Sequence, residues 1–265
     1  MELVETNGTS LACEQRGAGD PPFVFIHGWA CDHSFWQPQF DDLSRDHRCV
    51  AIDLRGRGQS PPVPPYDAAT AADDVAGVMA ALELGPAILV GHSLGGLVAL
   101  LVNERNPEYV LGTVLGDSPL TAAAEGRFPA MVEAIRAAGS MEPARAFVES
   151  FFRESTPAAV AAKARAVMLT GDFAVAAGML DKAEVFAGRV DALLHTADQK
   201  PLMLFWSEHP LGDPAHVREV TVFARQEPLA NSGHFFQLEQ PEVTNALLHA
   251  FLDDVERDPR LALKK

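Results

Sequence analysis

The sequence predicts an α/β fold, in which a mostly parallel β-sheet is flanked by helices. Short apolar runs bounded by turn residues recur along the chain, as buried strands do, at 23–26, 49–52, 87–90, 112–115 and 202–206. Helix-compatible stretches lie between them, notably at 68–84 and 94–104. This alternation implies crossover connections between parallel strands.

The two ends of the chain complete this pattern. Near the start, short alternating segments at 3–6 and 11–15 flank Asn7-Gly8, a pair that strongly favours a tight hairpin turn. The sheet is therefore expected to begin with antiparallel strands. Near the end, residues 242–255 have the spacing of an amphipathic helix.

Between these core elements, residues 119–198 are rich in alanine and favour helix without a convincing strand. We expect a helical cap here, inserted after the sixth strand. The core domain would then comprise residues 1–118 and 199–265. The predicted cap carries six phenylalanines, which favour an apolar ligand: Phe128, Phe147, Phe151, Phe152, Phe173 and Phe186.

Composition and charge exclude several classes of partner. The chain of 265 residues is 48% hydrophobic and 22% charged, as in globular proteins. Its 36 acidic and 21 basic residues give a formal charge of −15, which disfavours nucleic acid and anionic membranes. No apolar run reaches membrane-spanning length, no secretory signal is visible, and the three cysteines lack zinc or disulfide spacing. A cytoplasmic location is expected.

One motif carries a specific chemistry. Gly91-His92-Ser93-Leu94-Gly95 follows the apolar run 87–90 and opens the helical stretch 94–104, which is the context of a nucleophile elbow. Glycines two positions either side of Ser93 relieve crowding in such a tight turn. The following helix would present the Leu94 N–H, and its dipole, to negative charge on a reacting carbonyl. Ser93 is thus the expected nucleophile.

Together with three other motif blocks, this elbow makes the sequence resemble the α/β-hydrolase superfamily over nearly its whole length except the predicted cap. Four blocks carry the resemblance by their order and spacing: 25–29 (FIHGW), 53–60 (DLRGRGQS), 91–96 (GHSLGG) and 232–239 (SGHFFQLE). The resemblance implies that His234 is the general base and that the Trp29 N–H is the second oxyanion donor. It also implies structural roles for His27 and for the 53–60 loop.

The acid of the triad departs from the commonest family pattern. In the family it usually follows the strand after the cap, but here that strand continues as Ser207-Glu208-His209-Pro210, with proline at the expected aspartate. One strand earlier, Asp117 ends a buried strand beside that of the nucleophile, at the catalytic edge of the sheet. Asp117 is therefore the expected acid. Asp213 and Glu208 are alternatives that would need a rearranged loop.

The expected activity is hydrolysis of a small carboxylic ester or lactone through an acyl-enzyme, without metal or organic cofactor. One alternative is a cofactor-free dioxygenase acting on a hydroxyquinolone-type ring with the same triad, since residues 28–33 resemble the corresponding loop of that branch. Against it, Leu94 follows the nucleophile where those enzymes carry histidine. The other alternative is a non-catalytic binding protein for small molecules. The sequence does not indicate an oligomeric state.

Overall fold

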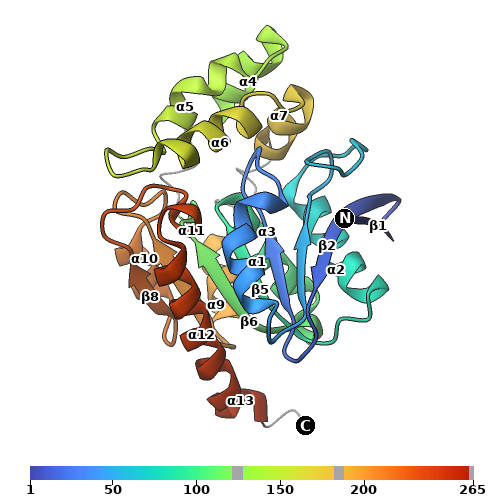
Figure 1. Cartoon of the computed structure of the whole chain (residues 1–265), viewed down its shortest axis with the longest axis vertical. Helices are drawn as coiled ribbons and strands as arrows, with labels where there is room; N and C mark the ends of the chain where they lie inside the picture. Colours follow the sequence, from blue (N-terminus) through green and yellow to red (C-terminus); the bar gives the residue numbers. More distant parts are fainter. Residues whose placement is uncertain (121–127, 182–187, 263–265) are drawn as a thin grey trace.

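The computed structural model describes residues 1–120, 128–181 and 188–262. Its centre is an eight-stranded sheet with the order β1-β2-β4-β3-β5-β6-β7-β8 (Figure 1). The strands are β1 (Glu2–Thr6), β2 (Thr9–Arg16), β3 (Phe23–Ile26), β4 (Cys49–Ile52), β5 (Ala87–His92), β6 (Val110–Gly116), β7 (Leu202–Trp206) and β8 (Arg225–Pro228). From β4 to β8 all neighbours are parallel. The predicted fold class is confirmed.

The sheet begins antiparallel, as expected. β1 and β2 form a hairpin in register, with Thr6 opposite Thr9, and β2 then pairs antiparallel with β4. The two turn residues, Asn7 and Gly8, have φ values of 32° and 74°. These left-handed conformations are why an Asn-Gly pair suits this position.

Helices cover both faces of the sheet, so both faces of its central strands are buried. On one face α2 (Ala68–Ala81), α3 (Leu94–Arg105), α9 (Val190–Ala197) and α10 (Pro214–Val220) share one apolar core with the sheet. On the other face α1 (Gln37–Leu43) and α12 (Pro241–Arg257) share a second core. This burial on two sides explains the nearly continuous apolar runs of the parallel strands.

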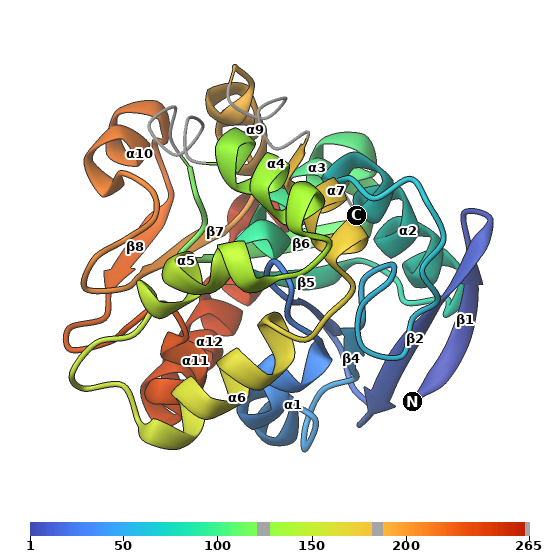
Figure 2. The same cartoon turned by 90° about the horizontal axis from the view of Figure 1, so that it is seen from above.

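Between β6 and β7 the described chain is helical and includes α4 (Phe128–Ala138), α5 (Arg145–Glu149), α6 (Ala158–Met168) and α7 (Phe173–Asp181). These four helices lie together beyond the carboxyl ends of the strands (Figures 1 and 2). The last described helix before β7, α9, contacts α3 beside the sheet. The predicted division into core and cap stays a prediction, and the packing of α9 favours a shorter cap. Phe186 of the predicted cap lies outside the described residues.

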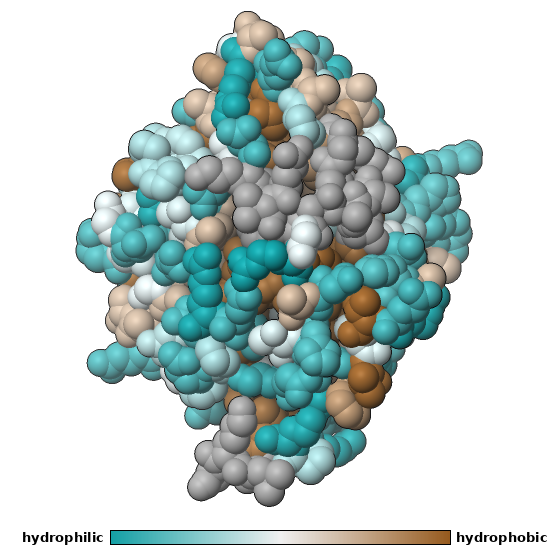
Figure 3. All heavy atoms as spheres, turned by 180° about the vertical axis from the view of Figure 1, so that it is seen from behind, coloured by the Kyte–Doolittle hydropathy of each residue, from teal (hydrophilic) through white to brown (hydrophobic). Residues whose placement is uncertain are grey.

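Short helices connect the remaining segments: η1 (His33–Trp36), η2 (Pro107–Tyr109), η4 (Glu142–Ala144), α11 (Phe236–Glu239) and α13 (Pro259–Ala262). The face in Figure 3 is mainly hydrophilic, with hydrophobic side chains in small separate spots. Within the described ranges, none of the helices is long and apolar enough to cross a bilayer.

Candidate active site

Ser93 occupies the sharp turn between β5 and α3. Its φ and ψ are 53° and −117°, a strained conformation for a residue with a Cβ. The glycines on either side leave no room for side chains. A Cβ on Gly91 would lie 2.3 Å from the Gly95 carbonyl oxygen, and one on Gly95 would lie 2.3 Å from the Ile26 carbonyl oxygen. The elbow geometry therefore depends on both glycines.

The structure brings His234 and Asp117 together. His234 Nδ1 lies 2.7 Å from Asp117 Oδ2, and both residues are buried. Because a carboxylate only accepts, the imidazole donates its Nδ1 proton, which leaves Nε2 as the acceptor in a neutral ring. The other carboxylate oxygen, Oδ1, faces the backbone N–H groups of Ser207 at 3.4 Å and Leu211 at 3.3 Å. The loop after β7 thus holds this carboxylate.

The two alternative acids lie elsewhere. Asp213 caps α10, where its Oδ1 accepts hydrogen bonds from the backbone N–H groups of Ala215 and His216. Glu208 is exposed and lines a separate polar hollow with His209 and Asn231. Neither is hydrogen-bonded to His234 in the described structure.

The two amides expected to bind an oxyanion flank the nucleophile. Leu94 is the first residue of α3, where backbone N–H groups have no partner within the helix. Trp29 follows Gly28, whose absent Cβ would lie only 3.2 Å from the Cβ of Ser93. The backbone of this loop is thus packed directly against Ser93. The Trp29 indole donates to the Ala176 carbonyl oxygen of α7 at 2.8 Å, which fixes the loop to the cap.

His27 joins two segments of chain, and both of its ring nitrogens are engaged in hydrogen bonds to the backbone. Its Nε2 accepts the Leu54 N–H at 3.0 Å, so Nδ1 carries the proton and donates to the Gly28 carbonyl oxygen at 2.8 Å. Burial lowers the pKa of His27, which keeps the ring neutral. This geometry fits the loop-organising role that the resemblance implies.

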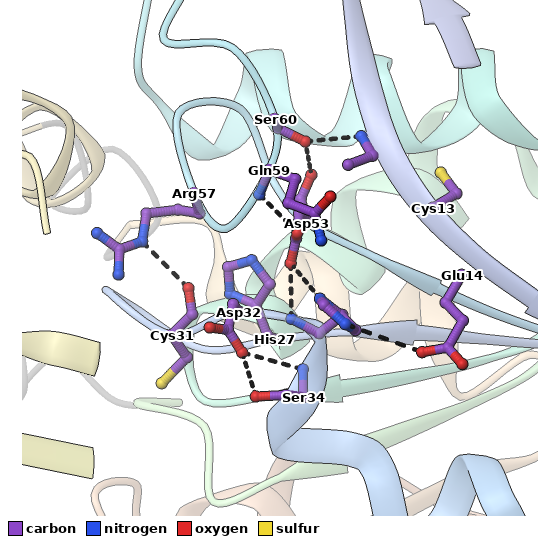
Figure 4. A network of polar contacts seen from close by, with 12 residues as sticks. Cys13, Glu14, His27, Cys31, Asp32, Ser34, Asp53, Arg57, Gln59 and Ser60 are labelled. Atoms are coloured by element: carbon purple, nitrogen blue, oxygen red, sulfur yellow. Dashed lines mark hydrogen bonds and ion pairs between the residues drawn. The ribbon is translucent and has the colours of Figure 1, made fainter. Parts of the chain in front are cut away.

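Asp53 connects the loops after β3 and β4 through hydrogen bonds with His33 and Gln59 (Figure 4 labels Asp53 and Gln59). One oxygen of Asp53 accepts from both the backbone and the Nδ1 of His33, each at 2.8 Å, and the other accepts the Gln59 N–H at 2.9 Å. Burial raises the pKa of Asp53, but the hydrogen bonds from the His33 side chain and from the His33 and Gln59 backbone outweigh it and leave this pKa below its usual value. The hydrogen bond to Asp53 in turn raises the pKa of His33.

Arg57 stabilises the loop that carries Trp29, residues 27–32, which we call the oxyanion loop. Its guanidinium is buried and donates to the carbonyl oxygens of Ala30 and, at 3.1 Å, Cys31 (Figure 4 shows the latter), and reaches that of Val167 in α6 at 3.4 Å. Ala30 has a φ of 56°, so the loop it holds is strained. A substrate clamp, which an arginine here could form in principle, does not fit this arrangement, since backbone carbonyls occupy the guanidinium.

An apolar pocket lies between the cap and the elbow. Its volume is about 460 Å³, part of which is open to solvent. Ser93, His234 and Trp29 line it together with cap and core side chains that include Leu97, Phe128, Phe147, Phe151, Met168, Leu180 and Leu211. Among the described residues, histidine is the only titratable type that could carry a positive charge in this lining.

Further aromatic and histidine residues lie around the site and in the core. Trp29 lines the pocket, whereas Phe35 and Trp36 are core residues. His92 lies beneath the elbow and donates to the His234 carbonyl oxygen at 2.8 Å, and burial holds its pKa well below the usual value. His47 is buried against Phe23. No group of three His, Cys, Asp or Glu side chains suited to a metal ion occurs in the described part of the chain.

Comparisons with known proteins agree with this geometry. A model of the alpha/beta hydrolase family matches residues 23–247, so the chain belongs to this family of hydrolases. AB hydrolase superfamily protein YisY of Bacillus subtilis is 43% identical over 99 residues, 37% of each chain. The 3-oxoadipate enol-lactonase 1 of Acinetobacter baylyi is 29% identical over 138 residues, 52% of each chain. The matches thus span between about a third and a half of these curated relatives.

A solved structure extends the likeness over nearly the whole fold. The protein described as Est816, an N-acyl homoserine lactone degrading enzyme, superposes with a TM-score of 0.82 at 26% identity. The superposition covers 94% of this chain and 100% of that one. The likeness to that structure therefore includes both the sheet and the helices between β6 and β7.

Proposed function

We propose that the protein hydrolyses small carboxylic esters or lactones whose acyl part is uncharged and apolar, through an acyl-enzyme on Ser93. The observation that carries the proposal is the 2.7 Å hydrogen bond between Asp117 and His234 at an apolar pocket that also contains Ser93. A buried carboxylate that orients a histidine beside an elbow serine is the arrangement of a serine hydrolase. The lactonase relatives are consistent with hydrolysis of a lactone or ester, whereas the uncharged acyl part is proposed from the pocket lining alone.

The reaction follows from these positions. His234 Nε2 removes the Ser93 hydroxyl proton as the oxygen attacks the carbonyl carbon, and Asp117 stabilises the imidazolium that forms. The N–H groups of Trp29 and Leu94 hold the oxyanion, a contribution of about 3 kcal/mol per donor. The imidazolium then gives its proton to the leaving alkoxide. Water, activated by the same histidine, releases the acid and restores Ser93.

The apolar lining defines the substrate further. A carboxylate on the acyl group would lose its hydration in the pocket without gaining a cationic partner from the described lining, which is costly. A neutral alkyl or aryl group would instead gain from burial against the phenylalanines. We also place the protein in the cytoplasm, where the buried free thiols of Cys13, Cys31 and Cys49 would stay reduced.

Two measurements test the proposal. A fluorophosphonate probe should label the protein at Ser93. In a panel of esters and lactones matched in size, neutral apolar acyl groups should be turned over and carboxylate-bearing ones should not. Absence of labelling at Ser93 would favour a binding protein, and oxygen uptake with a hydroxyquinolone would favour the dioxygenase alternative.

A further inference from the structure

A cap residue lies directly on the imidazole of His234. The ring of Phe151, which follows α5, stacks on this imidazole with centroids 4.3 Å apart and an interplanar angle of 29°. The ring of His92 lies 4.5 Å from the same imidazole. His234 is thus packed between the ring of a cap residue and the ring of a core residue. Its Nδ1 bond to Asp117 fixes one ring edge, and these neighbours limit how the ring can turn.

The same cap residue holds the backbone of the base. The N–H of His234 donates to the Phe151 carbonyl oxygen at 3.1 Å, a hydrogen bond between core and cap. The preceding residue, Gly233, is packed so closely here that a Cβ would lie 2.7 Å from this carbonyl oxygen. The turn that presents His234 is therefore built against the cap segment and has no spare room.

A carboxylate extends this contact along the cap. Glu239 Oε2 accepts the Gly233 N–H at 2.8 Å and the hydroxyl of Thr156 at 3.1 Å. The Thr156 hydroxyl oxygen also accepts the Arg153 N–H at 2.9 Å. One end of this bridge lies on the turn of the base and the other on the cap segment 151–156. The bridge and the Phe151 contacts together join these two parts of the chain.

Phe151 also connects to the other side of the site. Its ring lies 4.7 Å from that of Phe147, edge to face, and Phe147 lies 5.9 Å from the Trp29 ring in the oxyanion loop. The cap segment therefore contacts His234 directly and is connected to the Trp29 ring through Phe147. Phe152, the next residue, packs instead against Phe235 and Arg165.

From these contacts we infer that Phe151 is a positioning residue for His234, and that the cap segment 151–156 sets the geometry of the base. The inference rests on the proposed function. The segment does more than shape the pocket: hydrolysis of a substrate too small to touch it still depends on it, because the base is held by it. A misplacement of about 1 Å in such a group can cost about 100-fold in rate.

The test uses the full-length protein and p-nitrophenyl acetate, whose acyl group is minimal. Phe151→Leu keeps an apolar side chain but removes the ring, and should lower kcat by about 10- to 100-fold while KM changes by less than about threefold. Phe151→Tyr, which keeps a ring against the imidazole, should restore most of kcat. Phe152→Leu is the matched control and should retain wild-type kcat.

Thr156→Val provides a second variant, because it removes the hydroxyl of the Glu239 bridge and leaves the pocket lining unchanged. It should lower kcat several-fold without raising KM. Wild-type kcat in both Phe151→Leu and Thr156→Val, or an effect of Phe151→Leu on KM alone, would overturn the inference. If Phe151→Leu does not fold, Thr156→Val decides. Failure of the fluorophosphonate probe to label Ser93 in the wild-type protein would instead refute the proposed function.

Discussion

Two of the three proposed triad residues have left-handed backbone conformations. Ser93 has a φ of 53° and Asp117 a φ of 44°, although neither is glycine. Such conformations cost of order 1–3 kcal/mol and persist where the surroundings enforce them. Ser93 N–H donates to the Gly116 carbonyl oxygen at 2.7 Å and Asp117 N–H to that of Phe205 at 2.8 Å. These backbone bonds to neighbouring strands hold both residues at the sheet edge.

Replacement of the nucleophile gives the most direct test at this scale. Ser93→Ala should abolish ester turnover, with a loss of roughly 10⁴- to 10⁶-fold in kcat, because no other group can form the acyl-enzyme. The fold should be kept, since alanine fits the same space. Steady-state kinetics and circular dichroism check both points. Residual activity near the wild-type value would place the nucleophile elsewhere.

The acid is tested by exchange of its charge alone. Asp117→Asn should cut kcat by roughly four orders of magnitude, because the amide no longer orients and stabilises a protonated His234. Asparagine tolerates the left-handed conformation, so the fold should survive. Asp213→Asn is the matched control at the start of α10 and should be nearly silent in kinetics. The opposite pattern would move the acid to the loop after β7.

The sequence predicted these residues but not what surrounds them. Asp117 could be inferred because proline, Pro210, stands where the family usually has the acid. In addition, Asp117 ends the strand beside that of Ser93. Glu239 lies within a motif block, yet its bridge to Thr156 joins residues 83 positions apart. The contact of Phe151 with His234 depends in the same way on the docking of the cap. Packing between distant segments leaves no spacing signal in the chain.

At the scale of elements, the loop after β4 supports the oxyanion loop, which follows β3, through Arg57. Arg57→Met should destabilise the protein by about 1–3 kcal/mol, because buried carbonyl oxygens of Ala30 and Cys31 lose their donor. It should also lower kcat, since these carbonyls belong to the loop that presents Trp29.

Urea unfolding measures the stability difference. The control is Arg105→Met, at a surface ion pair with Asp73, which should change the free energy of unfolding by at most about 1 kcal/mol. Equal effects of the two substitutions would contradict the supporting role of Arg57.

The pair of His33 and Asp53 makes loop stability depend on pH. The pKa of His33 is raised from 6.5 in the folded protein, so its contribution is present below about pH 6.5 and is lost as pH rises through the raised value. The pKa of Asp53 is lowered from 3.8, so its contribution is present above about pH 4 and is lost as pH falls through the lowered value. The pair therefore stabilises most in mildly acid solution.

Melting temperatures of His33→Gln and the wild type check this dependence. Their difference should be larger near pH 5.5 than near pH 8.5, because only the lower value leaves both partners charged. The exposed His195→Gln serves as the control. A difference that is independent of pH would mean that the charge on His33 contributes nothing.

Strands differ in how far the sequence predicts them. The buried parallel strands were found because both of their faces are apolar, and β3, β4 and β7 have the predicted ends. β8, with the residues Arg-Gln-Glu-Pro, carried no apolar run and was missed. It lies at the edge of the sheet and is only half-buried, so its pairing to β7 comes from tertiary structure.

For the whole molecule, the arrangement is an eight-stranded sheet with the proposed triad residues near the carboxyl ends of its strands and helices α4 to α7 beyond them. The proposed acid, Asp117, precedes helices α4 to α7 in sequence, whereas the proposed base, His234, follows them. The family resemblance predicts a nucleophile before the base, but an acid before these helices departs from its commonest pattern. The extent of the cap, with α9 beside the sheet and not among the cap helices, follows from contacts that composition cannot reveal.

The bonds that join Ser93 to Gly116, and Asp117 to Phe205, bear on how the protein should respond to heat. They attach the proposed nucleophile and acid to interior strands, whereas the loop of the proposed base, His234, is held by the segment 151–156 between β6 and β7. Local opening of such a segment costs less free energy than melting of the central sheet. Warming should therefore displace His234 first and cause reversible inactivation below the temperature at which the sheet melts. Cooling the protein from a temperature at which it is inactive but its sheet is intact should restore activity without refolding.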